Sequence, residues 1–393
     1  MNKLFDTVIV RHGAEIGVKS SLTRTRYDKL LIKNIKAKLK AENLKINRID
    51  RRFGRIYIKT DTPFEVANSI AKIFGVSSTS PAASCKASLD EIADMAVMLA
   101  KEKGDKPLKF AVKCRRVGQH AFTSIDVCRH VGARILEEMG GRGWRVDLEN
   151  PELTINIEIR DEDAFLYFDI IRGVGGLPLG SQGPVLCLIS SGIDSPVAAW
   201  LSMRRGCTIT LLHLNIQPYS GEETIKKVVE LTKVLAKWSP AFKVKLLMAP
   251  FGEVLKNIIE KCPSKLTCVL CKRMMLRTAE KIALNRRLMG IVTGDSIGEQ
   301  ASQTLRNMAV ISEAVKRIPI YRPLTGFDKP ETEKLAREIG TYEISSRPDE
   351  GCKAAPSRPT VAAKIDEVIE AEKQLDIESL IDSSVNRLVE LEV

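Results

Sequence analysis

Residues 185–195 read VLCLISSGIDS and combine a short apolar run with a turn rich in serine and glycine. The apolar residues 185–189 have the length and composition of a buried parallel strand. A proline at position 196 and good helix formers over residues 197–205 predict a helix directly after the turn. The stretch therefore predicts a strand–loop–helix unit whose unpaired backbone N–H groups and positive helix end point at one place, which suits a phosphate.

The loop differs from a Walker-type phosphate loop in one respect. Asp194 stands before the terminal serine, where a Walker loop has lysine. This argues against a clamp on the β- and γ-phosphates and fits a loop that holds a leaving pyrophosphate while the α-phosphate is attacked. An ordinary turn between a strand and a helix is the alternative, since short motifs also occur by chance.

Beyond this unit, strands and helices alternate regularly along the chain. The expected strands are residues 208–215, 244–248 and 290–293, and the expected helices are residues 222–238, 252–261 and 272–287. This alternation is typical of an α/β fold with a doubly wound parallel sheet, whose ligands bind at the carboxyl ends of the strands. Asp194 and Gly294 each follow such a strand, so we expect them to converge.

The front half of the chain predicts two smaller α+β modules. The first has a strand at residues 7–10, a helix at 25–42, strands at 47–50 and 55–59, and a helix at 64–73. The second has helices at residues 88–101 and 124–139 and strands at 110–116, 145–147, 153–159 and 164–170. A Gly/Pro-rich segment follows. We expect domains at residues 1–60, 61–171 and 181–393, with a linker at residues 172–180.

The positive charge of the chain is concentrated at its start. The net charge is +12, and residues 1–60 hold 16 Lys and Arg against 5 Asp and Glu. A basic segment on a nearly neutral body indicates nucleic-acid binding, with a solvated basic helix as the alternative. Lys113, Arg115 and Arg116 lie near the end of a predicted strand and are candidates for gripping a phosphate backbone, or form a surface salt-bridge set.

The composition also indicates the cellular compartment of the protein and the chemical state of its cysteines. The start of the chain has no secretory features, no apolar run has membrane length, and the nine cysteines are an odd number. These features predict a cytoplasmic protein with free thiols, metal or redox chemistry and no membrane association. Cys268 and Cys271 form a C-x-x-C before the predicted 272–287 helix, where basic neighbours and a helix start favour thiolate. Buried apolar cysteines are the alternative.

Several stretches of the chain resemble a known family, the tRNA 4-thiouridine synthetases (tRNA sulfurtransferases). The matching stretches are LPLG at 177–180, SSGIDSPVA, TGDSIGEQASQTLRNM at 293–308 and RPLTGFDKPE at 322–331. In the front half, VIVRHGAEIGVKS resembles the family's ferredoxin-like opening, and FAVKCRRVGQHAFTS through VDLENPELTINIEI resembles its RNA-binding THUMP domain. The resemblance covers nearly the whole chain. It implies a pyrophosphatase-loop (PP-loop) catalytic domain of the adenine nucleotide alpha hydrolase-like class.

Two features depart from the family pattern. The family's loop has Ser-Gly-Gly where this chain has Ser190, Ser191 and Gly192. Ser191 is therefore expected to accept a backbone geometry that glycine normally supplies. Only 41 residues follow Cys352, too few for the rhodanese domain of some members. The resemblance thus implies a form without that domain, and an altered route of sulfur delivery.

Carried over by motif, the resemblance implies specific site residues. Asp194, Lys329 and Cys352 are the expected catalytic residues, and Lys329 is expected to neutralise charge that develops on the phosphates. The expected ATP contacts are Leu188, Ile189, Ser190, Gly192, Ser195, Lys272, Gly294 and Gln303. The resemblance further pairs Cys352 with Cys268 and Cys271, either as ligands of an iron–sulfur cluster or as a dithiol that carries persulfide or a disulfide.

The implied reaction is ATP-dependent thiolation of uridine at position 8 of tRNA. The C4 oxygen attacks the α-phosphate of ATP, pyrophosphate leaves, and sulfur then displaces AMP, with Mg²⁺ spread across the phosphates. The expected partners are tRNA and a sulfur donor, either sulfide or a desulfurase that carries persulfide. Both a monomer and a homodimer are compatible with the sequence.

Two other functions remain open from the sequence. One is a PP-loop synthetase that activates a small carboxylate, although that activity gives no reason for the basic front half. The other is a non-catalytic RNA-binding protein whose ATP loop has decayed at Ser191. The retention of Asp194, Gln303, Lys329 and Cys352 argues against decay.

Overall fold

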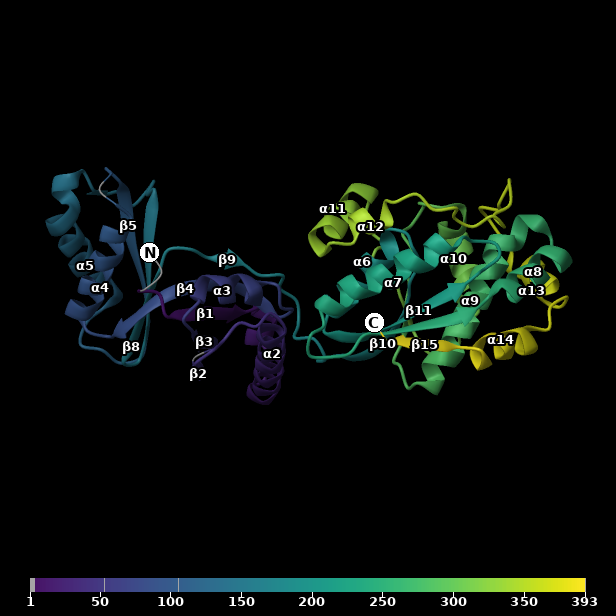
Figure 1. Ribbon diagram of the computed structural model, residues 1–393, viewed down its shortest axis with the longest axis horizontal. Helices are drawn as coiled ribbons and strands as arrows, with labels where there is room; N and C mark the ends of the chain where they lie inside the picture. The colour runs from purple at the N-terminus through teal and green to yellow at the C-terminus, as the bar shows by residue number, and fades with distance from the viewer. Residues whose placement is uncertain (1–3, 53, 105, 393) are drawn as a thin grey trace. The chain divides into compact units, whose positions relative to one another are not determined.

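The computed structural model describes residues 4–52, 54–104 and 106–392. The chain divides into two compact units, unit 1 (Met1–Leu177) and unit 2 (Pro178–Val393) (Figure 1). Within the described residues, no helix combines the length and the apolar composition needed to cross a bilayer.

Unit 1 is built on one nine-stranded sheet. Its strand order is β2-β3-β1-β4-β8-β7-β5-β6, with β9 also paired to β4. The strands are β1 (Thr7–His12), β2 (Arg48–Arg52), β3 (Arg55–Lys59), β4 (Val76–Lys86), β5 (Lys109–Val117), β6 (Arg145–Val146), β7 (Leu153–Arg160), β8 (Asp163–Tyr167) and β9 (Ile171–Arg172). Strand β4 pairs with β1 through Val76 to Ala82 and with β8 through Ala83 to Lys86. One strand therefore joins both front modules.

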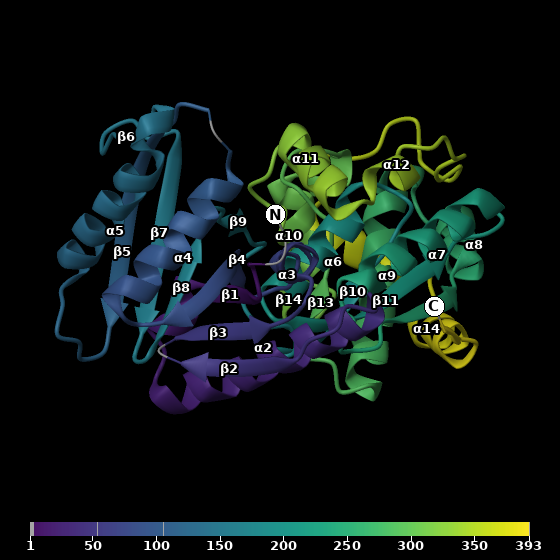
Figure 2. The same ribbon diagram turned by 60° about the vertical axis from the view of Figure 1, so that its left-hand side comes forward.

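The helices of unit 1 pack in two separate cores. They are α1 (Ala14–Gly17), α2 (Ser21–Ala41), α3 (Pro63–Ala71), α4 (Leu89–Glu102) and α5 (Ser124–Met139). Helices α2 and α3 share one core with β1 and β3, and α4 and α5 share the other with β5, β7 and β8. Figure 2 shows α4 and α5 side by side. Helix α2 begins ahead of the predicted residue 25, because Ser20 caps it by accepting a hydrogen bond from the Thr23 N–H.

Unit 2 contains the predicted parallel sheet. Its strand order is β14-β13-β10-β11-β12-β15, and every pairing is parallel except that of β12 with β15. The strands are β10 (Gly183–Leu188), β11 (Cys207–Asn215), β12 (Lys245–Pro250), β13 (Ile291–Val292), β14 (Ile320–Tyr321) and β15 (Val389–Glu392). The predicted α/β class and parallel sheet are confirmed, whereas β14 and β15 were not predicted.

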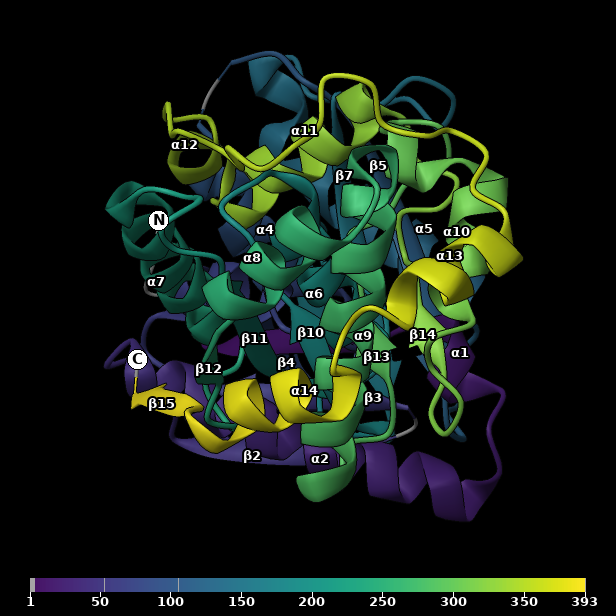
Figure 3. The ribbon, with the colours of Figure 1, turned by 90° about the vertical axis from the view of Figure 1, so that its right-hand side faces the viewer.

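Two groups of contacting helices accompany this sheet. The first is α6 (Asp194–Arg204), α7 (Glu222–Lys237), α11 (Lys329–Ile339) and α12 (Tyr342–Ser345). The second is α8 (Gly252–Lys261), α9 (Thr267–Asn285), α10 (Leu305–Ser312), α13 (Ile365–Glu372) and α14 (Ile377–Asn386). Figure 3 shows the C-terminal segment, in yellow, running past α9 to the sheet edge, where β15 pairs with β12. Helix α9 begins at Thr267 rather than at the predicted residue 272.

A buried ion network ties the end of α13 to α9. Both guanidinium groups of α9 contact Glu372: Arg273 Nε lies 2.7 Å and Arg277 Nη1 lies 2.6 Å from its Oε1. Arg273 also donates to Glu313 at 2.9 Å. Burial alone would raise the pKa of Glu372, but the hydrogen bonds from Arg277 and Arg273 outweigh it and lower that pKa. The network therefore holds the C-terminal segment on the core through charge as well as apolar contact.

Candidate active site

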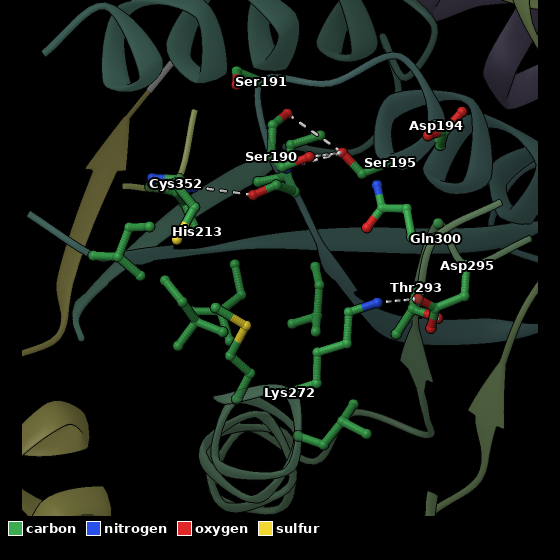
Figure 4. Close-up of a pocket in the computed structure, with 18 of the residues that line it drawn as sticks. Ser190, Ser191, Asp194, Ser195, His213, Lys272, Thr293, Asp295, Gln300 and Cys352 are labelled. Carbon is green, nitrogen blue, oxygen red and sulfur yellow. Dashed lines mark hydrogen bonds and ion pairs between the residues drawn. The ribbon is translucent and has the colours of Figure 1, made fainter. Parts of the chain in front are cut away.

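A pocket of about 360 Å³ opens at the carboxyl ends of β10, β11 and β13, as parallel α/β sheets predict (Figure 4). The loop after β10 and the start of α6 form one wall, and Lys272 of α9 forms another. The lining includes these residues that were expected at the site: Leu188, Ile189, Ser190, Asp194, Ser195, Lys272, Gly294, Gln303 and Cys352. Segments far apart in the sequence therefore meet at one cavity.

Hydrogen bonds between its two ends close the loop after β10. The Ser195 hydroxyl oxygen accepts from the Ser190 N–H at 2.9 Å and lies 3.0 Å from the Ser190 Oγ (Figure 4). Helix α6 begins at Asp194, two residues before the predicted start at Pro196. The first N–H groups of a helix have no intrahelical acceptor, which leaves this end able to bind an anion.

Ser191 does not impose the strained backbone that the sequence led us to expect. Among the described non-glycine residues, positive φ occurs at Asn43, Asp161 and Arg287, and Ser191 is not one of them. Its hydroxyl instead donates to Asp349 Oδ2 at 2.6 Å. The serine that departs from the family pattern thus has a specific partner elsewhere in unit 2.

Asp194 and Lys329 form an ion pair beside the loop. Lys329 Nζ lies 2.9 Å from Asp194 Oδ1 and 2.7 Å from Glu299 Oε1. Burial raises the pKa of Asp194 despite the nearby ammonium. Burial would lower the pKa of Lys329, but its hydrogen bonds to Glu299 and Asp194 raise that pKa. Lys329 therefore stays protonated and carries positive charge to the position where pyrophosphate is expected.

A second ion pair orients Lys272 inside the pocket. Its Nζ lies 2.9 Å from Asp295 Oδ1, and Asp295 Oδ2 accepts from Thr293 Oγ1 at 2.8 Å (Figure 4). Burial would raise the pKa of Asp295, but Lys272, Thr293 and Arg322 together lower it. Asp295 was not among the predicted site residues. The available signal was its position directly after a predicted strand, where parallel sheets collect functional residues.

His213 is buried beside the loop and lines the same pocket. Its Nδ1 lies 3.0 Å from the Ile189 carbonyl oxygen, and burial lowers its pKa. The imidazole is therefore neutral and donates its Nδ1–H to that carbonyl, which leaves Nε2 as an acceptor.

Gly294 allows two loops to approach closely. A Cβ at this position would lie 2.8 Å from the backbone nitrogen of Ser195 and 2.9 Å from its Cα. These neighbours are backbone atoms at the start of α6, so they cannot rotate away as a side chain does. The absence of a side chain at Gly294 is a packing requirement of the pocket.

Replacing Gly294 with alanine is expected to weaken ATP binding, because the loop after β10 must shift to admit the methyl group. Overpacking of this kind costs about 1–3 kcal/mol, which corresponds to roughly 5- to 150-fold in affinity. Titration calorimetry with a non-hydrolysable ATP analogue measures the change. Gly326→Ala is the matched control, since a Cβ there meets nothing within 4 Å. Equal affinities of the two variants would contradict this account.

The three expected sulfur-site cysteines interact electrostatically, and burial disfavours the thiolate form of Cys268 and Cys271. Cys352 lines the pocket, and its charge influences both Cys268 and Cys271. Burial raises the pKa of Cys268 and raises that of Cys271 to about 12. The prediction that basic neighbours and a helix start favour thiolate at this C-x-x-C is therefore wrong. Both cysteines lie inside the first turns of α9, where burial outweighs the charge of Lys272.

The described residues contain no group of three or more His, Cys, Asp or Glu side chains arranged to hold a metal ion. As placed, the three thiols do not make a cluster site, and each of the nine cysteines is free. The acidic groups near the loop, Asp194 and Glu299, suit Mg²⁺ only as part of a shell that phosphate oxygens complete.

The expected RNA contacts lie on β5 of unit 1, where they divide between the two faces of the strand. Lys113 and Arg115 are exposed and, two residues apart, share one face. Arg116 points to the other face, where its guanidinium donates to the Gly118 carbonyl at 3.1 Å and lies 3.0 Å from His120 Nδ1. Lys113 and Arg115 therefore form the exposed pair of this set.

Comparison with protein-family models gives three matches along the chain. Residues 7–80 match the ThiI ferredoxin-like domain, residues 86–169 match the THUMP domain, and residues 180–377 match the model described as thiamine biosynthesis protein (ThiI). The third match covers β10 to β14, the loop after β10 and Cys352.

Known proteins match over nearly the full length. Proteins named "Probable tRNA sulfurtransferase" from Methanosarcina mazei and Methanobrevibacter smithii are each 41% identical, over 97% and 98% of this chain and 94% and 99% of theirs. A crystal structure described as a 4-thiouridine synthetase–RNA complex with bound ATP matches with a TM-score of 0.88 and 30% identity, over 98% of this chain and 99% of that one. A Pyrococcus horikoshii protein matches with a TM-score of 0.68 and 29% identity, over 85% of this chain and 99% of its own. The phosphate loop, its ion pairs and these full-length similarities together establish that the chain belongs to the ThiI family.

Proposed function

We propose that this protein is a tRNA sulfurtransferase that uses ATP to convert uridine, at position 8 of tRNA, to 4-thiouridine. The observation that carries the proposal is that Cys352 lines the same pocket as the loop after β10, Asp194 and the Lys272–Asp295 ion pair. An activating nucleotide and a sulfur-bearing group would thus act on one base. The similar structure described as a synthetase with RNA and ATP supports this combination.

In the first step the uridine C4 oxygen attacks the α-phosphate and pyrophosphate leaves. Leu188 and Ile189 flank the nucleotide, while Ser190, Gly192, Ser195 and the first N–H groups of α6 bind the pyrophosphate. Lys329 and Lys272 offset the charge that develops on the departing oxygens, and Gly294 and Gln303 complete the wall. The adenylated C4 oxygen is then a good leaving group.

The carboxylates near the loop, Asp194 and Glu299, together with the phosphates of ATP, suit a magnesium ion in this first step. Mg²⁺ keeps a nearly octahedral oxygen shell and binds through one or two carboxylates together with substrate phosphates. Asp194 is the carboxylate that we expect to hold it, because it borders both the pocket and the loop. When bound, the ion would stabilise the negative charge of the pyrophosphate.

In the second step sulfur attacks C4 and AMP leaves. We propose that Cys268, Cys271 and Cys352 act together in delivering that sulfur, from either sulfide or a desulfurase that carries persulfide. A persulfide would form on Cys352 when a desulfurase passes the outer sulfur of its own persulfide to that thiol and leaves as a thiol; transfer of this sulfur to C4, completed by attack of Cys268 or Cys271 on the Cys352 sulfur, would leave a disulfide that an external thiol reduces. Sulfide, which forms no persulfide without an oxidant, would instead be carried by an iron–sulfur cluster, and a cluster requires a rearrangement of the three thiols. Iron analysis of anaerobically purified protein, set beside the Cys352→Ala variant, separates these forms.

Unit 1 is proposed to bind the tRNA through its phosphates and shape. The chain's basic excess lies in residues 1–60, and Lys113 and Arg115 add an exposed pair. A cytoplasmic location is proposed on the basis of the nine free cysteines, which suit a reducing compartment.

The protein, incubated anaerobically with unmodified tRNA, ATP and sulfide, is expected to give 4-thiouridine together with AMP and pyrophosphate. Nucleoside mass spectrometry after digestion measures the thiolated base, and chromatography identifies the nucleotide product. Release of ADP, or ATP consumption without a thiolated base in the wild-type protein, would refute the proposal. A transcript with cytidine at position 8 is the control for the site of modification.

A further inference from the structure

The segment that carries Cys352 is anchored to unit 2 through one buried lysine. Lys227 of α7 has a side chain only 2% exposed. Its Nζ donates to the carbonyl oxygens of Ser345 at 3.0 Å and Arg347 at 2.7 Å, and to Asp349 Oδ2 at 3.1 Å. Each of the three ammonium protons therefore has an acceptor, and all three acceptors belong to the segment that leads to Cys352.

Such an arrangement needs a physical reason, because burying an ammonium ion is costly unless it is fully hydrogen-bonded and paired. Burial would raise the pKa of Asp349, but the Ser191 hydroxyl and Lys227 lower it, so the carboxylate is ionised and pairs with Lys227. Lys227 and Asp349 lie 122 residues apart in sequence. The pair is a long-range tether rather than a local cap.

The same tether reaches the phosphate loop. Asp349 Oδ2 accepts from the Ser191 hydroxyl at 2.6 Å, and the Ser345 hydroxyl lies 3.2 Å from the Gly192 carbonyl to which it donates. Two neighbouring residues of the loop are thus bonded to the segment that Lys227 holds. Ser191, at the position where the family pattern has glycine, supplies one of these bonds.

Cys352 itself lies between two fixed points. The Gly351 N–H donates to Asp349 Oδ1 at 3.2 Å, and the Lys353 N–H donates to the Tyr219 carbonyl at 2.9 Å. Lys227 therefore sets the position of a cysteine that it does not contact. It does so through Asp349 on one side, while the loop before α7 holds the other side.

We infer that Lys227 is a positioning residue for sulfur transfer, which holds Cys352 against the phosphate loop so that sulfur reaches the adenylated base. The inference rests on the proposed function. A displaced cysteine would leave adenylation intact and slow the second step, because a misplacement of about 1 Å can cost about 10²-fold in rate. Lys227 does not line the pocket, and the loop after β10 keeps its own closing hydrogen bonds between Ser190 and Ser195, so we expect the loss of Lys227 to act mainly on Cys352.

Lys227→Met tests the inference in single-turnover reactions with tRNA, ATP and sulfide. Pyrophosphate release is expected to keep the wild-type rate, while formation of 4-thiouridine falls by about 10²-fold. Lys226→Met, an exposed lysine of the same helix, is the matched control and is expected to leave both rates unchanged. Equal losses in both steps, or no loss in either, would overturn the inference.

Asp349→Asn is measured alongside, because an unpaired segment could unfold the Lys227 variant. It keeps the size of the side chain and removes the charge that pairs with Lys227, so it is expected to show the same selective loss. Parallel losses of the two steps in this variant would also overturn the inference. A wild-type protein that forms no 4-thiouridine would instead refute the proposed function, so the two failures are distinguishable.

Discussion

Lys329→Met is expected to slow pyrophosphate release by about 10²- to 10³-fold, with tRNA affinity unchanged, because a positioned cation is removed from the developing phosphate charge. The ammonium lies between Asp194 and Glu299 and stays protonated, since its hydrogen bonds to both raise its pKa. Among the described residues, Lys329 is the cation that forms an ion pair with Asp194. Quench-flow measurement of labelled pyrophosphate gives the rate, and filter binding gives the tRNA affinity.

Two variants make this result specific. Lys334→Met removes an exposed lysine from the same helix, α11, and is expected to leave the rate unchanged. Asp194→Asn removes the paired carboxylate and is expected to slow the same step while tRNA binding persists. If Lys329→Met lowered the tRNA affinity by the same factor as the rate of pyrophosphate release, Lys329 would be an RNA contact and not a residue that binds the phosphates of ATP.

Glu372→Ala is expected to lower the free energy of unfolding by about 3–5 kcal/mol, because it removes the buried carboxylate that Arg273 and Arg277 share and leaves Arg273 with Glu313 alone. The side chains of Arg273 and Glu372 are 1% and 7% exposed, so solvent screens this pair little. Urea denaturation of the full chain, followed by far-ultraviolet circular dichroism, measures the change. Glu370→Ala, which removes an exposed carboxylate from the same helix, is expected to change it little.

The same residue predicts how stability depends on pH. The folded state lowers the pKa of Glu372 below its ordinary value of 4.5. Its contribution is therefore complete above that ordinary value and is lost as the pH falls through the lower, folded-state pKa. The wild-type protein is expected to lose more stability than Glu372→Gln over this acidic range. Parallel curves for the two proteins would contradict the assignment.

The sequence predicted the parallel sheet because its evidence is local. Each strand–loop–helix unit carries its own apolar run and its own turn residues, and the loop at 190–195 combines both within a few positions. The convergence of Asp194 and Gly294 followed from the rule that the ends of parallel strands meet at one edge, whereas the resemblance to the family implied the other pocket residues. Pairings between distant segments leave no such local pattern in the sequence. Strand β15 pairs with β12 although Val389–Glu392 lies far along the chain from Lys245–Pro250, and only folding brings the two together.

The start of α9 shows why one local prediction failed. Thr267, Cys268 and Val269 have modest helix propensity, so the sequence favoured a loop before residue 272. In the structure Val269 and Leu270 are buried in the core of unit 2, and this burial stabilises the helix over that segment. The same burial raises the pKa of Cys271, so one tertiary effect changed both the helix boundary and the expected cysteine chemistry.

Strand β4 has a consequence for how RNA is selected. Because its two halves belong to the ladders of both front modules, neither module can swing against the other without breaking backbone hydrogen bonds. In the proposed role of unit 1, a tRNA that touches both modules therefore meets two contact surfaces at a fixed spacing. An RNA whose contact points are spaced differently loses one set of contacts outright, so selection by spacing needs no reading of base edges.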